Sequence, residues 1–353
     1  MMSKNRSVLF VAAFLAASAA VAARADVNMA FVTVGNPGNA ADQNYYGQGS
    51  YGSVAYTYQM GKYDVTVGQY CQFLNAVAKT DTYGLYNNYM AVGGDYGFYP
   101  TIGITQSGSS GSYSYSVTGS DPQAANCPVA DVTWGDAARF CNWLQNNQPH
   151  RAEGPGTTET GAYTLNGATT NAALMAITRN AGAVDFIPSE NEWYKAAYYN
   201  PSNGSYWLYP TQSNNAPSNV LSATGTNNAN DDLFATGTYN VNYFGILTDP
   251  TNYLTPVGAF AASPGPYGTY DMGGDVDQWN EAKISGTVRG KRGGNWIAPS
   301  DYLAASLRDS GDPTNELYDV GFRVASAVPE PGSLMMLLGF AGMALLYYWR
   351  RHA

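Results

Sequence analysis

Apolar and polar residues follow three different patterns along the chain. Long apolar runs occupy the two ends, short amphipathic stretches begin near residues 67, 134 and 190, and polar stretches lie between them. Each amphipathic stretch follows a hydroxyl residue that has an acid or an amide three positions later, which is the capping arrangement at the start of a helix. The pattern therefore predicts three helices, beginning after Thr66, Thr133 and Ser189.

Apolar side chains give two of the predicted helices one buried face. They recur at the i, i+3, i+4 and i+7 spacing that brings residues to one side of a helix. They are Val67, Tyr70, Cys71, Leu74 and Val77 in the first helix, and Ala137, Phe140, Cys141 and Leu144 in the second. The third helix is expected to end at about Tyr198, because Asn200-Pro201 follows and proline does not continue a helix.

Strands and loops are marked less sharply than helices. Residues 55–60 and 321–324 are the candidate strands. The stretches 83–127 and 201–254 are rich in Gly, Ser, Tyr, Thr or Asn and start no new apolar period. Both stretches exceed ordinary loop lengths. Because no new apolar period begins in either, we expect elaborate ordered loops on one domain rather than a second domain.

The N-terminal end has the order of a secretion signal. Lys4 and Arg6 precede an apolar segment from Val8 to Ala23, and Ala23-Arg24-Ala25 fits the small-x-small pattern that signal peptidase cleaves. We expect cleavage after Ala25, which makes residues 1–25 a signal peptide. The alternative is a buried N-terminal helix.

The C-terminal end contains a segment that fits a membrane helix. Residues 333–349 carry no charge, and 17 residues at the helical rise span about 25 Å, enough for a thin bilayer core. Arg350 and Arg351 follow and are expected on the cytoplasmic side, which leaves the domain outside. The tail, residues 328–353, is thus predicted to cross the membrane before processing.

The tail also contains a short motif, Val328-Pro329-Glu330-Pro331, ahead of the apolar segment and the basic pair. This order resembles the PEP-CTERM sorting signal of Gram-negative bacteria. The resemblance implies cleavage near the motif by an exosortase and delivery to the cell surface or the exopolysaccharide matrix. A plain single-span anchor is the alternative.

Composition narrows the class of partner. The formal charge is −9, and the two ends carry five of the cationic residues, so the domain between them is more acidic still. Such a domain is not expected to bind nucleic acid. With 29 tyrosines and 12% charged residues, its polar surface is expected to contact polysaccharide or another envelope protein, unless the tyrosines are mostly half-buried. Of three cysteines, Cys71 and Cys141 are expected to be packed thiols, and no disulfide can be deduced.

Between residues 30 and 326 a series of motifs resembles the formylglycine-generating enzyme (sulfatase-modifying factor) family. The motifs are Tyr63-Asp64-Val65-Thr66, Pro128-Val129-Ala130-Asp131, Ile187-Pro188-Ser189-Glu190-Asn191-Glu192-Trp193, Gly274-Asp275-Val276-Asp277-Gln278-Trp279, Arg292-Gly293-Gly294-Asn295-Trp296 and Gly321-Phe322-Arg323-Val324-Ala325. The resemblance implies an α+β domain over residues 26–327, with the family's variant of the C-type-lectin fold and much irregular structure. It also implies that Arg292 and Arg323 serve the core by bridging buried carbonyls.

The resemblance does not extend to the family's catalytic residues. Its enzymes oxidise a substrate cysteine with copper held by two of their own cysteines, which suits a soft Cu(I) ion. The matching positions here are Ala298 and Leu303, and residues 297–308 contain no Cys, His or Met. We therefore expect no copper and no catalytic residues. The chain has two histidines, His150 and His352, too few for the related iron enzymes.

Calcium is the metal that the resemblance does imply. The family's first site corresponds to Asp275, Val276 and Gln278, and a second to Asn219-Val220 with Asp231 or Asp232 as a later ligand. Oxygen ligands are what a hard cation needs. The alternative is that the acids of the first site cap turns and form ion pairs.

Three functions remain open from the sequence. The first is a non-catalytic binding protein displayed at the envelope, which contacts its ligand through the tyrosine-rich loops. The second is a diverged formylglycine-generating or related oxidoreductase enzyme that acts on exported proteins. The third is a purely structural component of the matrix.

Overall fold

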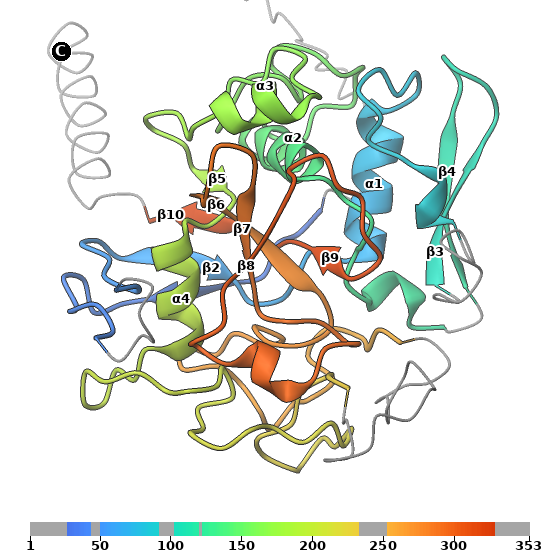
Figure 1. The fold of residues 1–353 in the computed structure, drawn as a ribbon. Helices are drawn as coiled ribbons and strands as arrows, with labels where there is room; N and C mark the ends of the chain where they lie inside the picture. The colour runs from blue at the N-terminus through green and yellow to red at the C-terminus, as the bar shows by residue number, and fades with distance from the viewer. Residues whose placement is uncertain (1–26, 44–49, 92–101, 120–121, 233–252, 329–353) are drawn as a thin grey trace, which may run out of the picture.

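The computed structural model describes residues 27–43, 50–91, 102–119, 122–232 and 253–328. Within these ranges, helices, short strands and long irregular connections form one mixed structure (Figure 1). This confirms the predicted α+β class. The expected signal peptide, residues 329–331 of the sorting motif and the predicted helix 333–349 lie outside the described residues, and none of the helices inside them is long and apolar enough to cross a bilayer.

The three predicted helices are confirmed, each with its cap. The side chains of Thr66, Thr133 and Ser189 each accept a hydrogen bond from the backbone N–H three residues later, and the backbone N–H of each cap residue donates the reciprocal bond to that later residue's side chain. These capping boxes satisfy N–H groups that a helix start leaves without partners. The helices are α1 (Val67–Val77), α2 (Trp134–Gln145) and α4 (Glu190–Tyr198), and a short α3 (Asn171–Ala176) was not predicted.

Two four-stranded sheets form the centre of the domain. The first has the order β1-β2-β10-β5 and is antiparallel throughout, whereas the second has the order β8-β7-β6-β9 with β6 and β9 parallel. The strands of the first are β1 (Phe31–Val34), β2 (Tyr58–Gly61), β5 (Asp185–Phe186) and β10 (Ala325–Ala327). Those of the second are β6 (Asp277–Lys283), β7 (Arg289–Arg292), β8 (Asp309–Gly311) and β9 (Val320–Gly321).

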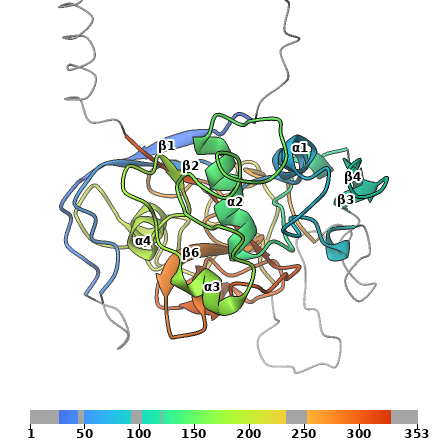
Figure 2. The same ribbon diagram turned by 90° about the horizontal axis from the view of Figure 1, so that it is seen from above.

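One stretch predicted to be a loop contains a β-hairpin. Within residues 83–127, strands β3 (Ile102–Ser107) and β4 (Ser114–Gly119) pair antiparallel, and both ribbon views place them at the edge of the molecule beside α1 (Figures 1 and 2). Ile102, Ile104 and Tyr115 are buried, so alternate positions of a Gly- and Ser-rich sequence suffice to attach the hairpin to the domain. The described parts of 201–254 contain neither helix nor strand, as predicted.

The two candidate strands are placed only in part. Strand β2 begins at Tyr58, so the first half of the candidate 55–60 precedes the strand. The candidate 321–324 contributes only Gly321, at the end of β9, and β10 begins after it at Ala325.

Aromatic side chains from distant parts of the sequence make the centre of the core. Phe73 of α1 lies with its ring centroid 5.4 Å from that of Phe140 and 5.2 Å from that of Trp143, both of α2. Phe322, just after β9, lies 5.4 Å from Phe140. These edge-to-face and tilted contacts fix both helices against the segment between β9 and β10.

Candidate functional site

The three cysteines, Cys71, Cys127 and Cys141, are all buried. Burial raises the pKa of Cys71 to about 11 and that of Cys141 well above its ordinary value. Since the thiolate is the form that binds metals and attacks disulfides, these groups are chemically quiet at neutral pH. The expectation that Cys71 and Cys141 are packed thiols is confirmed.

The two positions that the sequence analysis expects to match the family's catalytic cysteines lie in a well-packed region. Leu303 is fully buried at the end of the short 3₁₀ helix Ser300–Leu303, and its carbonyl accepts a hydrogen bond from Tyr198 (2.9 Å). Ala298 is 8% exposed, and its carbonyl accepts the backbone N–H of Asp232 (2.9 Å). The side chains at these two expected positions are thus a methyl and an isobutyl group, neither of which supplies the sulfur that a Cu(I) site needs.

The first calcium set does not fit a cation. The side-chain oxygen of Gln278 accepts hydrogen bonds from Trp193 Nε1 and Arg323 Nε, both at 2.7 Å, and its nitrogen donates to the carbonyl of Asp271 (2.7 Å). A ligand oxygen already facing two N–H groups, one of them cationic, cannot also face calcium. Gln278 instead joins α4, the 271 turn and the segment after β9.

Asp275 is likewise occupied by donors from the protein. Its carboxylate accepts bonds from Asn230 Nδ2 (2.6 Å) and from both the backbone N–H and the hydroxyl of Thr255 (2.8 Å each). Burial and the neighbouring Asp271 raise its pKa to about 7. Val276 is fully buried beside it. These bonds fit the structural alternative, in which the acids of this motif fix turns.

The predicted core role of the two arginines is confirmed. Arg323 donates to the carbonyls of Gly61 (2.8 Å), Tyr270 (2.9 Å) and Asp271 (3.0 Å). Arg292 donates to two carbonyls of the segment before β8 and pairs with the carboxylate of Glu190 (2.8 Å). Neither guanidinium reaches solvent, so both act as bridges inside the domain.

The second calcium set differs from the first because it contains buried side-chain oxygens that no donor among the described residues faces. Asp231 is fully buried, and within the described ranges neither of its carboxylate oxygens receives a hydrogen bond. The side-chain oxygen of the adjacent Asn230 has no partner there either, and burial together with Asp232 raises the pKa of Asp231 to about 7. Asn219 lies against them, donating to the Asp231 carbonyl (3.2 Å), while Val220 is exposed.

Buried oxygens without donors are costly unless something positive faces them. The second set therefore fits a hard cation held by carboxylate, amide and main-chain oxygens. No group of three or more His, Cys, Asp or Glu side chains suited to a metal occurs in the part of the chain that the structure describes, so amide and main-chain oxygens would complete the shell.

A wide hollow opens on another side of the domain, between the loop after α1 and the β3–β4 hairpin. Its volume is ≈ 570 Å³. Three tyrosines line it together with small polar side chains. The lining residues are Thr80, Asp81, Tyr86, Asn87, Asn88, Tyr89, Gln106 and Tyr113. All of them fall in or near the tyrosine-rich stretch that the sequence marks as a contact surface.

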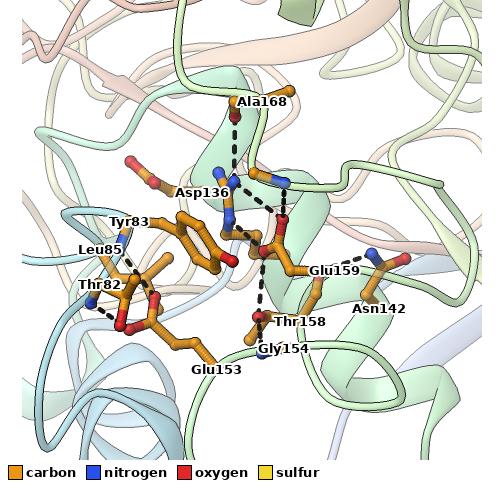
Figure 3. Close-up of polar contacts among 12 residues, drawn as sticks. Thr82, Tyr83, Leu85, Asp136, Asn142, Glu153, Gly154, Thr158, Glu159 and Ala168 are labelled. Carbon is orange, nitrogen blue, oxygen red and sulfur yellow. Dashed lines mark hydrogen bonds and ion pairs between the residues drawn. The ribbon is translucent and has the colours of Figure 1, made fainter.

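A buried ion pair supports the loop that forms one wall of this hollow. Arg139 of α2 donates to Glu159 through Nε (2.7 Å), and the Tyr83 ring lies 4.7 Å from the guanidinium carbon (Figure 3). Glu159 also accepts the backbone N–H of Gly167 (2.6 Å). Arg139 also donates to the Ala168 carbonyl (3.0 Å), so its guanidinium joins the 83 loop to the 154–168 segment.

A second carboxylate holds the same loop by its backbone. Glu153 accepts the N–H groups of Thr82 and Tyr83, and burial raises its pKa to about 7 (Figure 3). Asp81 accepts the N–H of Leu85 (2.7 Å) within the loop. The sequence analysis missed these supporting residues. The sequence pattern carried no signal for Arg139, because it lies on the side of the helix opposite the predicted apolar face, whereas the structure buries all of α2 from Trp134 to Leu144.

Comparison with known proteins identifies related sequences and folds. The family model described as "Sulfatase-modifying factor enzyme 1-like domain" matches residues 26–328, and that of the PEP-CTERM protein-sorting motif matches residues 327–351. Among solved structures, CarF is 19% identical, covers 85% of this chain and 99% of its own, and superposes with a TM-score of 0.50. Variable protein 1 of Treponema denticola is 20% identical, with coverages of 86% and 96% and a TM-score of 0.52. No curated protein sequence matches.

Proposed function

The chain belongs to the family of sulfatase-modifying factor enzyme 1-like domains, and from this premise we propose that it is a non-catalytic member that acts by binding. Its sorting motif marks it as an exported, envelope-associated protein of a Gram-negative bacterium, consistent with processing by an exosortase. We place it at the cell surface or in the exopolysaccharide matrix, where a polysaccharide or an envelope protein is its ligand.

One observation carries this proposal. The family resemblance matches Ala298 and Leu303 to the enzymes' copper-binding cysteines, and Cys71, Cys127 and Cys141 are all buried thiols. A copper oxidase needs thiolates that a substrate can approach. The alternative, a diverged formylglycine-generating or related oxidoreductase, draws on the family membership alone.

Copper binding and turnover test the proposal directly. The exported protein, purified from cells that express the full chain, is titrated with Cu(I) against a competing chelator and assayed for oxidation of a cysteine peptide. The matched control is the double variant Ala298→Cys/Leu303→Cys, which restores a sulfur pair. We expect the wild type to bind no Cu(I) tightly and the variant to gain binding; stoichiometric Cu(I) and peptide oxidation by the wild type would overturn the proposal.

We further propose that calcium binds at the second set. Asp231 and Asn219 would hold it through side-chain oxygens, with a main-chain oxygen at Val220, as the family resemblance implies. The donorless carboxylate of Asp231 supports this assignment. A calcium ion there would neutralise buried charge and stabilise the irregular segment between α4 and β6.

A further inference from the structure

We propose that the hollow between the loop after α1 and the β3–β4 hairpin binds a neutral, hexose-based glycan chain. This inference rests on the proposed binding function and names the site and the ligand class. A volume of ≈ 570 Å³ lies within the range of about 300–1,000 Å³ that small-molecule sites occupy. The hollow is open, which suits a section of an extended polymer better than an enclosed metabolite.

Aromatic rings give the hollow its first recognition element. Tyr86, Tyr89 and Tyr113 line it, and Tyr89 is 48% exposed. Pyranose rings present flat C–H faces that pack on aromatic faces, and their hydroxyls find partners in the tyrosine O–H groups. Tyr86 is held in place by a tilted contact with Tyr115 at 5.6 Å, so at least one ring needs no reordering on binding.

Polar side chains give the second element, and the structure fixes their positions. Asn87 accepts the backbone N–H of Tyr89 (2.9 Å) and donates to the Asp131 carbonyl (2.7 Å). Gln106 donates to the Tyr115 hydroxyl (3.1 Å). Each of these amide nitrogens has a second N–H that the bonds above do not use, and it can donate to a sugar hydroxyl at a defined point, as a specific site requires.

The charge of the lining sets the class of glycan. Among the described residues that line the hollow, Asp81 is the one charged side chain, and none is Lys or Arg. The whole chain carries a formal charge of −9. A uronic-acid or sulfated polymer would therefore meet an acid without a counter-charge, whereas a neutral hexose chain meets hydroxyls, amides and rings.

Both walls of the hollow are tied to the domain and to each other. The hairpin tip donates to the Lys79 carbonyl through the N–H groups of Gly111 (2.8 Å) and Tyr113 (3.1 Å). The opposite wall is the loop that Glu153 holds through the backbone of Thr82 and Tyr83. A site with fixed walls loses little conformational entropy on binding, which matters most for weak sugar contacts.

The test is calorimetric titration of the purified exported protein with three soluble hexasaccharides. Cellohexaose and maltohexaose are the neutral probes, and hexagalacturonate is the anionic one. We expect saturable binding of a neutral probe at micromolar to millimolar concentration and none of the anionic probe. Replacement of one stacking ring, Tyr89→Ala or Tyr113→Ala, should weaken binding about ten-fold.

Matched controls separate recognition from folding. Tyr302 is 44% exposed and lies outside the hollow, so Tyr302→Ala should leave affinity unchanged. Tyr89→Phe keeps the ring and should retain most of the affinity, while unaltered circular dichroism shows that each variant is folded. The proposal is overturned by the absence of neutral-glycan binding, by binding that survives both alanine substitutions, or by an envelope protein bound through these tyrosines instead. Such failures leave the copper result, and with it the non-catalytic assignment, untouched.

Discussion

The buried pair Arg139–Glu159 gives the sharpest test of the structure, through the substitution Glu159→Gln. Both side chains are almost fully inaccessible to solvent, at 1% and 2%. Glu159 accepts bonds from Arg139, from the Thr158 hydroxyl (3.1 Å) and from Gly167 N–H (2.6 Å). An amide of nearly equal volume removes the charge, places an NH₂ group among donors and leaves the guanidinium without its counter-ion.

The magnitude follows from what remains after the substitution. Arg139 keeps the Ala168 carbonyl (3.0 Å) and the Tyr83 ring, but no other carboxylate pairs with it among the described contacts. Removing one partner of a buried pair costs about 3–5 kcal/mol in the free energy of unfolding. For a domain of ordinary stability, about 5–15 kcal/mol, that is a large share.

Equilibrium urea unfolding, followed by tryptophan fluorescence, measures this loss. The control is Asp309→Asn, which removes one partner of Lys291 but leaves it a second carboxylate, Asp277 at 3.7 Å, and should therefore cost less than Glu159→Gln. The double variant Arg139→Met/Glu159→Gln should recover part of the loss, since no unpaired charge is then buried. A loss below about 1 kcal/mol for Glu159→Gln, or strict additivity in the double variant, would refute the reasoning.

Three further predictions concern the acids and one glycine. Burial raises the pKa of Glu153 from 4.5 to about 7, so this group stabilises the fold fully below pH 4.5 and loses that contribution as the pH rises through 7. The substitution Glu153→Gln should therefore reduce the difference between the urea midpoints measured at pH 5 and at pH 7.5. An unchanged difference would contradict this prediction. Calcium should raise the thermal midpoint of the wild type but not of Asp231→Asn, with Asp301→Asn as the control that keeps the response. Gly274 has φ of +85° and an added Cβ would overlap the Asn230 carbonyl, so Gly274→Ala should lower the urea midpoint strongly while Gly286→Ala, in open space, should not.

Local chemistry explains what the sequence could predict of the fold. Thr66, Thr133 and Ser189 start helices through bonds that reach only three residues along the chain, so a local pattern suffices. The sheets were not accessible in this way. Strand β10 pairs Ala325 with Met60, a contact that no local period specifies, and the β3–β4 hairpin has the Gly- and Ser-rich composition of a loop.

The same distinction applies to the candidate sites. The first calcium set is unsuited to a cation because Trp193 and Arg323 both donate to the side-chain oxygen of Gln278. These two donors lie 85 and 45 residues from Gln278 in the sequence, so no local pattern could reveal them. Family resemblance indicated Asp231, but only the packed structure shows its oxygens buried without donors. The hollow required the hairpin and the loop after α1 to meet, which the tyrosine content alone could not establish.

The place of β10 in its sheet has a consequence for the order of events during export. Ala325–Ala327 is the last described strand of the chain, yet it lies between β2 and β5 rather than at an edge. The translocation machinery delivers the chain from its N-terminal end, so this sheet cannot close until residue 327 has emerged. The sorting motif begins at the next residue, Val328, so the motif emerges as the fold is completed. A cut beyond Val328 releases a finished domain. A cut before Ala325 would release a domain that lacks a central strand of this sheet.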